Sequence, residues 1–316
     1  MKKHLLRSIV IGSSLLAAQA ANAFEIKHSA GVLELEQTPK KVVSYDLAQL
    51  DTLTALGIEA VAVPESSYKN SLAQYNDSPT VGTLFKPDYE ALKKIQPDLI
   101  IAGGRSAAAM DELAKIAPTI SFASDPNNFV DSVKDSVNSI AKAWDKEAEG
   151  EKLLEKLDQN IKQLHDLNKG KTGAFLFVMK DRVMTHAPGD RFGYIEELTG
   201  LKPILNARTA EELNQPRPEA DSPEAKARAQ KSADELSTVA KANPDWFIVL
   251  DRGALNDAET TAAKTLENHA EIGQTDAVKN DRVFYVEPNP WYVVTGGVSN
   301  LTTITDQMIE KMKTKN

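Results

Sequence analysis

The sequence contains no cysteine and no excess of positive charge. Without cysteine there can be no disulfide framework, thiolate zinc site, iron–sulfur cluster, cysteine nucleophile or thioether lipid anchor. The 37 lysines and arginines are outnumbered by 45 aspartates and glutamates, which gives a formal net charge of −8. Nucleic acids and anionic membrane surfaces attract a cationic face, so this composition argues against both as partners.

Long hydrophobic runs are also scarce. Residues 1–23 combine a cationic start, an apolar stretch and the small-x-small ending Ala21-Asn22-Ala23, and this three-part pattern predicts a cleaved secretory signal peptide. No later segment approaches the ~20 apolar residues of a membrane-spanning helix, so we expect an exported protein that is not inserted in a membrane. No cysteine follows the predicted cleavage site, which argues against a lipid anchor.

Short apolar segments alternate with helical patterns along the rest of the chain. Seven segments are predicted as strands: 41–47, 58–64, 98–104, 119–124, 173–180, 245–251 and 282–287. Several are almost continuously apolar, which is typical of parallel strands covered on both faces. The predicted fold class is therefore α/β.

Two pairs of segments repeat in the same order and at nearly the same spacing. The segments PDLIIAGGR (97–105) and PDWFIVLDR (244–252) both run from Pro-Asp through an apolar stretch to an arginine. The second pair consists of the segments 44–61 and 190–204. Within them, Gly57 and Gly200 are each predicted to end a helix. This pattern predicts two similar α/β lobes, and a chance match of short segments is the alternative.

One long helix is predicted between the two copies. Across residues 146–169, large apolar side chains recur every three or four positions, at Leu153, Leu157, Ile161, Leu164 and Leu167. Asp158 and Lys162 are predicted to pair across one turn. At 1.5 Å per residue the helix spans roughly 33 Å, about the width of a small domain, so we interpret it as a strut between lobes rather than a surface helix within one.

The expected organisation therefore has four parts. They are a signal peptide (1–23), an N-terminal α/β lobe (24–145), a connecting helix (146–169) and a C-terminal α/β lobe (170–316). Two such lobes that face each other form a ligand cleft between them.

Three arginines occupy positions where α/β folds bind anions. Arg105 and Arg252 follow predicted strands, and ligands of open α/β sheets bind beyond the carboxyl ends of strands. Arg191 stands at the start of a predicted helix (192–200), where free backbone N–H groups favour an anion. Arginine keeps its charge when desolvated and presents a planar fork of donors. The three residues predict a site for an anionic, oxygen-rich ligand, and surface or ion-paired arginines are the alternative.

Two aromatic residues lie in the proline-flanked segment 287–297. One or both rings of Trp291 and Tyr292 could face the same cleft. The phenol of Tyr292 could bond a ligand or, as phenolate, ligate ferric iron. For Trp291, packing in the core is an equally good interpretation.

Four groups of motifs carry a resemblance to a known family. They are LIIAGGR with KIAPTISF (99–105 and 115–122), GDRFGYIEELTG (189–200), NPDWFIVLDRG (243–253) and RVFYVEPNPWYVVTGG (282–297). Together they resemble the periplasmic substrate-binding proteins of iron–siderophore ABC transporters, especially those for catecholate siderophores. The resemblance covers essentially the whole mature chain and implies two α/β lobes joined by one long helix, with the ferric complex between them.

The resemblance also implies roles for individual residues. Arg105, Arg191 and Arg252 would face the negative charge of the ferric complex, and Tyr292 would touch or ligate the iron. Relatives that complete the iron shell of a tetradentate siderophore use a histidine from the loop before the second Pro-Asp segment, but here that stretch, 228–232, contains none. We therefore expect a complete six-oxygen complex or one that uses Tyr292 alone. His186 could substitute, although a lone histidine there is more often structural.

The expected function is capture of a ferric siderophore in the periplasm by a monomeric protein with no intrinsic cofactor, which delivers it to an inner-membrane ABC permease. The resemblance implies permease docking through one acidic residue per lobe, and Glu90 and Glu235 are the candidates. Solvated helix carboxylates are the simpler interpretation of each.

Three other functions are compatible with parts of the same sequence. A haem- or cobalamin-binding protein on the same scaffold is the nearest alternative. A zinc or manganese binder needs convergent histidine and carboxylate ligands, whereas the histidines after residue 23 are widely spread, at His28, His165, His186 and His269. A periplasmic hydrolase is a distant alternative, because the chain has no GxSxG elbow, no HExxH motif and no phosphate-binding glycine loop. We therefore expect no enzyme activity.

Overall fold

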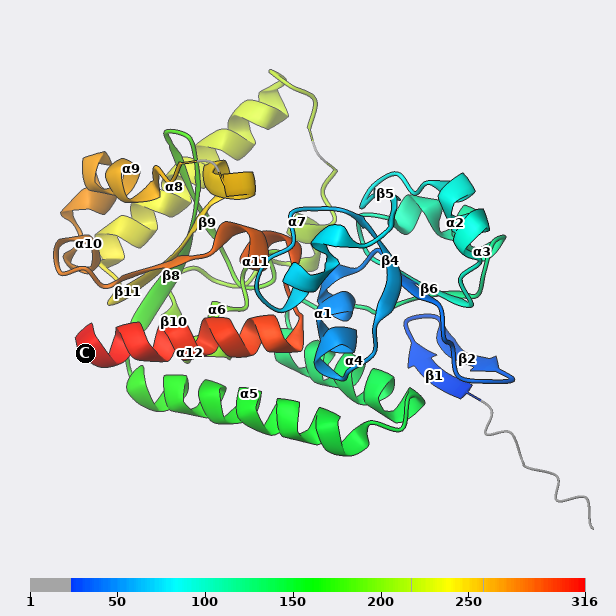
Figure 1. Cartoon of the computed structure of the whole chain (residues 1–316). Helices are drawn as coiled ribbons and strands as arrows, with labels where there is room; N and C mark the ends of the chain where they lie inside the picture. Colours follow the sequence, from blue (N-terminus) through cyan, green and yellow to red (C-terminus); the bar gives the residue numbers. More distant parts are fainter. Residues whose placement is uncertain (1–23, 217, 258, 316) are drawn as a thin grey trace, which may run out of the picture.

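The computed structural model describes residues 24–216, 218–257 and 259–315 (Figure 1). The predicted signal peptide lies outside the described residues. Within the described part of the chain, no helix has the length and hydropathy needed to cross a bilayer.

The apolar segments build two separate sheets. The first has the order β5-β4-β3-β6-β7 and is parallel throughout. Its strands are β3 (Val42–Ser44), β4 (Ala60–Glu65), β5 (Thr80–Thr83), β6 (Leu99–Ala102) and β7 (Thr119–Ser121). Strands β3 and β6 are buried on both faces, as their continuous apolar sequences predict.

The second sheet has the order β10-β8-β11-β12, also parallel, and β9 is paired antiparallel to β8. Its strands are β8 (Thr172–Met179), β9 (Arg182–His186), β10 (Lys202–Pro203), β11 (Trp246–Asp251) and β12 (Val283–Val286). All six residues of β11 are buried. We keep the predicted division, so the lobe that holds the first sheet is the N-terminal lobe and the lobe that holds the second is the C-terminal lobe.

All seven predicted strands are present, and the strands that sequence reasoning missed are mostly short or partly exposed. The missed strands are β5, β9, β10 and an antiparallel hairpin of β1 (Phe24–His28) and β2 (Gly31–Leu35). Strand β2 has no fully buried residue and β10 has only two residues. Neither therefore has the buried apolar run from which a strand can be predicted.

Helices cover the two sheets (Figure 1). In the N-terminal lobe they are α1 (Leu47–Ala55), the 3-10 helices η1 (Asn70–Asp77) and η2 (Ala107–Ala109), α2 (Tyr89–Ile95), α3 (Met110–Ala114) and α4 (Phe129–Ala143). After α5 (Glu147–Leu167) come α6 (Ile195–Thr199), α7 (Ala210–Leu213), α8 (Pro223–Ala242), η3 (Arg252–Asp257), α9 (Ala262–Asn268), η4 (Ile272–Gln274), α10 (Asp276–Lys279), α11 (Pro288–Val293) and α12 (Val298–Lys315).

The two sheets repeat one arrangement. If β3, β4, β6 and β7 are matched with β8, β10, β11 and β12, the strand order is the same in both. The Pro-Asp motifs have the same structural role: Asp98 accepts the N–H of Lys41 at 2.8 Å, and Asp245 accepts the N–H of Thr172 at 2.8 Å. Each carboxylate thereby ties the start of one central strand to the start of its neighbour. The structure thus shows the repeat that the sequence predicts.

The predicted long helix is α5, which runs alongside α12 and contacts α4 (Figure 1). Its buried side chains include Leu157 and Leu164, as predicted. The predicted ion pair within the helix is wrong, because Asp158 pairs with Lys134 of α4 and Lys162 pairs with Asp166. The neighbouring helix offers Asp158 a cation that the sequence of α5 alone does not reveal.

An apolar cluster joins the lobes. Phe129 and Val133 at the start of α4 pack in one core cluster with Leu157 of α5, Phe175 of β8 and Leu301 of α12. The contact between lobes is therefore a continuous part of the hydrophobic core.

Candidate functional site

Arg105 follows the carboxyl end of β6, as predicted. The turn that carries it is held by Ser106, whose hydroxyl accepts the N–H of Gly103 at 2.9 Å. A Cβ on Gly103 would lie 3.1 Å from the Cα of Asp46, so glycine lets the end of β6 approach the turn between β3 and α1. From there Arg105 reaches the other lobe, where its Nη2 donates to the carbonyl of Tyr292 at 2.9 Å.

Arg191 lies in the loop between β9 and α6. Asp190 shapes this loop, because its carboxylate accepts the N–H of Ala187 at 2.9 Å and its carbonyl accepts the N–H of Gly193 at 2.8 Å. A Cβ on Gly193 would lie 2.1 Å from the carbonyl oxygen of Ala187, so no side chain fits there. The Nη2 of Arg191 donates to the same Tyr292 carbonyl, also at 2.9 Å.

The prediction that Arg191 begins a helix is wrong. The helix α6 starts only at Ile195, and Tyr194 is its N-cap residue. Residues 187–193 instead form a tight turn around Asp190. Arg191 is therefore held by loop geometry, and a helix dipole does not explain its position.

Arg252 follows the last residue of β11, again as predicted. The preceding Asp251 is buried, and its carboxylate accepts the N–H groups of Gly253, Thr261 and Ala262 at 2.9, 2.7 and 2.9 Å. These bonds fix the backbone directly after Arg252 and at the start of α9. The side chain of Arg252 is half-buried.

The three arginines meet at one ring. The guanidinium carbons of Arg105, Arg191 and Arg252 lie 5.7, 4.5 and 4.9 Å from the ring centroid of Tyr292. They come from three distant parts of the chain and from both lobes. We call Arg105, Arg191, Arg252 and Tyr292 the arginine–tyrosine cluster. The structure thus brings together four of the residues selected from the sequence.

The cluster carries positive charge that is not neutralised locally. Among the side chains that the structure describes, no carboxylate oxygen lies within 4 Å of these three guanidinium groups. Burial lowers the pKa of Arg105, and the charge of Arg191 lowers it further, while Tyr292 and Asp46 oppose the shift. Like charges brought together at a partly buried place are costly, so an anionic ligand would relieve the repulsion.

Tyr292 has a perturbed phenol. Its partial burial acts to raise the pKa, but a hydrogen bond with Arg252 and the charge of Arg191 act the other way, and together they hold the pKa of Tyr292 below the usual value. The phenolate is therefore easier to form here than at an isolated tyrosine. A phenolate oxygen is a good ligand for a hard cation such as ferric iron.

Of the two interpretations of Trp291, the structure supports packing in the core and does not support a ring that faces the ligand. Trp291 is 1% exposed and stacks on Phe175 and Tyr194, with ring centroids 5.9 and 5.7 Å apart. The proline-flanked segment forms the short helix α11, and adjacent residues of a helix point about 100° apart. One ring therefore enters the core while the next, Tyr292, faces the arginines.

Sequence reasoning missed an aromatic layer beneath the cluster. Phe177 and Phe192 pack against Tyr292, with ring centroids 6.4 and 6.0 Å apart, and Arg191 lies over Phe192 at 4.8 Å. The signal was present, because Phe175 and Phe177 alternate along one predicted strand and so share a face. We call Phe175, Phe177, Phe192 and Trp291 the aromatic layer.

His186 packs against this layer. Its ring packs against Phe175, Phe177 and Phe192, with centroids 5.4 to 5.8 Å away. Burial lowers its pKa despite the nearby Asp190. The arrangement favours a neutral structural histidine over an iron ligand. Within the described residues, no group of three or more histidine and carboxylate side chains is arranged to hold a metal ion.

The two predicted docking carboxylates differ. Glu90 on α2 is 76% exposed and pairs with Lys93 one turn away. Glu235 on α8 is 16% exposed, and both of its oxygens accept hydrogen bonds from Arg208. Arg208 also bonds Asp190 at 3.1 Å, so Glu235 helps to hold the loop that carries Arg191. Because its carboxylate is paired inside the lobe, Glu235 is the less accessible of the two predicted docking residues.

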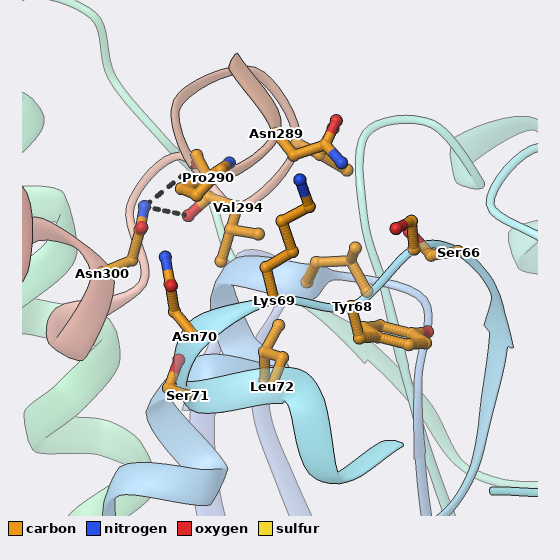
Figure 2. A pocket seen from close by; sticks show the side chains of 13 residues that line it. Ser66, Tyr68, Lys69, Asn70, Ser71, Leu72, Asn289, Pro290, Val294 and Asn300 are labelled. Carbon is orange, nitrogen blue, oxygen red and sulfur yellow. Dashed lines mark hydrogen bonds between the residues drawn. The ribbon is translucent and has the colours of Figure 1, made fainter. Parts of the chain in front are cut away.

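A small cavity lies beside α11 at the junction of the lobes (Figure 2). Its volume is about 40 Å³, and it is lined by residues 66–72 and by Asn289, Pro290, Val293, Val294, Leu47 and Asn300. Pockets for small organic ligands usually measure about 300–1,000 Å³. This cavity is too small for a siderophore complex, and Tyr292 is not among its lining residues.

Two α/β lobes that bring cationic side chains together at strand ends define a bilobal ligand-binding protein. Residues 42–290 match the periplasmic binding protein family, and the chain belongs to this family. Petrobactin-binding protein YclQ of Bacillus subtilis is 30% identical over 288 residues, which cover 89% of this chain and 83% of YclQ. Ferric-anguibactin-binding protein FatB of Vibrio anguillarum is 24% identical over 297 residues, 90% of this chain and 86% of FatB.

Solved structures show the same relationship. The crystal structure of YclQ aligns with a TM-score of 0.77 and 26% identity, and covers 92% of this chain and 99% of that one. The periplasmic catecholate-siderophore-binding protein VctP of Vibrio cholerae aligns with a TM-score of 0.75 and 27% identity, with coverage of 92% and 99%. The α/β fold with two lobes, predicted from the sequence, is confirmed.

Proposed function

We propose that this protein captures a ferric siderophore of the catecholate type and delivers it to an ABC permease for iron uptake. One observation carries the proposal: arginines from both lobes surround Tyr292, and no described carboxylate lies within 4 Å of their guanidinium groups. The names of YclQ, FatB and VctP, which bind petrobactin, ferric anguibactin and catecholate siderophores, support the same ligand class.

The charges of ligand and site match. A ferric tris-catecholate carries a formal charge of three minus, and the cluster offers three guanidinium groups. Charge-assisted hydrogen bonds from arginine contribute about 1.5–3 kcal/mol each where water is partly excluded. Two of the guanidiniums also hold the Tyr292 carbonyl, which keeps their planes in place before the ligand arrives. Recognition would therefore rest on charge and shape.

The siderophore would supply all or nearly all of the iron ligands. Tyr292 is the protein side chain placed to reach the iron, and its lowered pKa favours the phenolate form. His186 is held in the aromatic layer and is not available as a second ligand. We therefore infer a six-oxygen complex, or one completed by Tyr292 alone.

The rest of the proposal concerns location and partners. We infer that the protein is a monomer in the periplasm, released by cleavage after residue 23 and not lipidated, and that it binds its ligand without chemical change. Glu90 remains the docking candidate in the N-terminal lobe, because its carboxylate is exposed.

Fluorescence titration tests the proposed ligand. Trp291 lies next to Tyr292 in the sequence and packs in the aromatic layer, so a bound ferric catecholate, which absorbs visible light, should quench its emission. We expect saturable quenching at micromolar ligand. The triple variant Arg105→Gln, Arg191→Gln, Arg252→Gln should lose it, whereas a charge-matched control at the exposed residues Lys94, Lys241 and Lys264, each changed to Gln, should retain it.

Two results would overturn the proposal. One is the absence of saturable quenching in the unmodified protein. The other is binding of haem or cobalamin, seen in the absorbance spectrum, in place of ferric catecholates.

A further inference from the structure

A buried carboxylate of the N-terminal lobe holds the start of a helix in the C-terminal lobe. Asp51 of α1 is fully buried, and its Oδ2 accepts the N–H groups of Ser299 and Asn300 at 2.9 and 3.2 Å. These are among the first N–H groups of the 18-residue helix α12, which have no partner within their own helix. The hydroxyl of Ser71 donates to the other oxygen. Together, these three hydrogen bonds fix the orientation of the Asp51 carboxylate.

The fit around Asp51 is close. A Cβ on Gly297, the residue before α12, would lie 2.5 Å from the Oδ2 of Asp51. Only glycine lets the start of α12 approach α1 so nearly. Gly297 thus has a specific role in the contact between lobes.

A second carboxylate crosses in the opposite direction. Glu197 belongs to α6 of the C-terminal lobe, and its two oxygens accept the N–H groups of Phe129 and Val130 at 2.8 and 2.7 Å. These residues begin α4, the last helix of the N-terminal lobe. The N-cap residue of α4, Asn128, makes no capping bond with its own side chain. Glu197 takes its place from the other lobe.

Each crossing contact lies close in sequence to the arginine–tyrosine cluster. Tyr292 lies six residues before α12, and the amide of Asn300 donates to the carbonyl of Pro290 at 3.1 Å, which ties α12 back to α11 (Figure 2). Arg191 lies in the loop that leads into α6, and Tyr194 stacks on Phe129 with ring centroids 3.9 Å apart. A shift at either contact would therefore be transmitted to a cluster residue.

We propose that Asp51 and Glu197 are positioning residues that set the relative placement of the two lobes, and with it the distance between Arg105 and the cluster residues of the C-terminal lobe. Each lobe caps a helix of the other, so neither can rotate without exposing buried N–H groups that lose their acceptor. An unsatisfied buried donor is costly, so the pair acts as two fixed points between the lobes.

The chain offers a matched control for ordinary capping. Asp88 accepts the N–H groups of Glu90 and Ala91, both at 3.0 Å, at the start of α2. This contact has the same chemistry as that of Asp51, but it lies within one lobe. Asp88→Ala should lower stability without changing the placement of the lobes.

Distance measurement between spin labels gives the most direct test, and the absence of cysteine makes labelling clean. Cysteines introduced at the exposed residues Lys94 of α2 and Lys264 of α9 place one label on each lobe. We expect Asp51→Ala and Glu197→Ala to widen or displace the distance distribution of the ligand-free protein, and Asp88→Ala to leave it unchanged. Unchanged distributions in both crossing variants, or the same change in the control, would overturn the proposal.

Conservative variants separate positioning from folding. Asp51 uses one oxygen for both N–H groups, so Asp51→Asn keeps an acceptor there and should restore the native distribution. Glu197 uses a different oxygen for each N–H, so Glu197→Gln places an amide NH2 against one donor and should not restore it. If Asp51→Ala fails to fold, the contrast between Asp51→Asn and Glu197→Gln carries the test, and equal behaviour of the two contradicts the proposal.

Affinity gives a second measurement, and it rests on the proposed function. Ferric catecholate should bind about tenfold more weakly to Glu197→Gln than to the unmodified protein, a loss of about 1.4 kcal/mol, because displaced lobes move Arg105 away from the other cluster residues. Asp88→Ala should bind normally. If the unmodified protein does not bind ferric catecholates, the proposed function fails, while the distances without ligand still decide the role of Asp51 and Glu197.

Discussion

The two lobes share a scaffold but contribute unequally to the cluster. Both place an arginine after the strand that follows the Pro-Asp motif, Arg105 in the N-terminal lobe and Arg252 in the C-terminal lobe. The C-terminal lobe adds Arg191, Tyr292 and the aromatic layer that supports them. Duplication of a scaffold thus accounts for a symmetric pair of arginines, and the remaining residues belong to one lobe.

The difference arises where the first strand of each sheet ends. In the N-terminal lobe β3 leads directly into α1, and Asp46 caps that helix by accepting the N–H of Ala48 at 3.0 Å. In the C-terminal lobe the antiparallel strand β9 and its loop come between β8 and α6, and this added segment carries Arg191. One inserted hairpin therefore makes the site asymmetric. The predictions below test this comparison, from the largest expected effect to the smallest.

Trp291→Ala should have the largest effect, because the aromatic layer has no counterpart in the N-terminal lobe. Loss of a buried aromatic ring should lower the free energy of unfolding by about 3–5 kcal/mol, measured by urea denaturation. Trp144→Ala, at the half-buried ring that meets Phe24, should cost less. Normal stability together with lost ligand binding would show instead that Trp291 contacts the ligand.

The single arginine variants test how the two lobes share the ligand. Arg105→Gln, Arg191→Gln and Arg252→Gln should each weaken ferric catecholate binding by about 1–3 kcal/mol, measured by fluorescence titration. Because Arg105 is desolvated and repelled by Arg191, its loss should leave the unfolding free energy within about 1 kcal/mol of the original. If only Arg191 and Arg252 matter, the ligand sits on the C-terminal lobe alone. Unchanged affinity in all three would refute the site.

The paired Pro-Asp variants test whether the repeated scaffold is equally important in both lobes. Asp98→Ala and Asp245→Ala each remove an acceptor of backbone N–H groups at the start of a central strand, and each should cost about 1–2 kcal/mol of unfolding free energy. The two effects should add, because the residues lie in different sheets. Asp181→Ala, at an exposed turn, is the control. A cost in one lobe only would contradict the structural equivalence.

Alkaline titration compares the tyrosines of the two lobes and should show the smallest effect. Burial raises the pKa of Tyr45 and Tyr68 in the N-terminal lobe, whereas the neighbouring arginines hold the pKa of Tyr292 below its usual value. Tyr292 should therefore ionise before Tyr45 and Tyr68. Ultraviolet absorbance measures this ionisation. The lowered pKa of Tyr292 stabilises the folded protein fully above the ordinary tyrosine pKa of about 10. This stabilisation is lost as the pH falls through the lower pKa that Tyr292 has in the folded protein.

Two variants assign that titration. Tyr292→Phe should remove the early step, and Arg252→Gln should move it to higher pH. An early step that survives Tyr292→Phe would belong to another residue and would contradict the proposed charge environment.

Much of this molecule could be predicted because the relevant signals are local. Apolar runs identified the central strands, and a repeated Pro-Asp pattern located Arg105 and Arg252 at equivalent strand ends. The ion pairs could not be predicted in the same way, because they join residues that lie far apart in the sequence. Nothing near Glu235 in the sequence shows that Arg208 donates hydrogen bonds to both oxygens of its carboxylate.

The sequence by itself determined the fold class, the internal repeat, and the residue types that meet a polyanion, because strand periodicity and arginine chemistry are properties of short segments. Only the tertiary structure decided that three guanidiniums share one ring, that Trp291 lies in the core beside an accessible Tyr292, and that Asp51 and Glu197 cap helices across the lobes. The physical reason is distance along the chain. A hydrogen bond between residues separated by more than two hundred positions leaves no periodic trace in either segment.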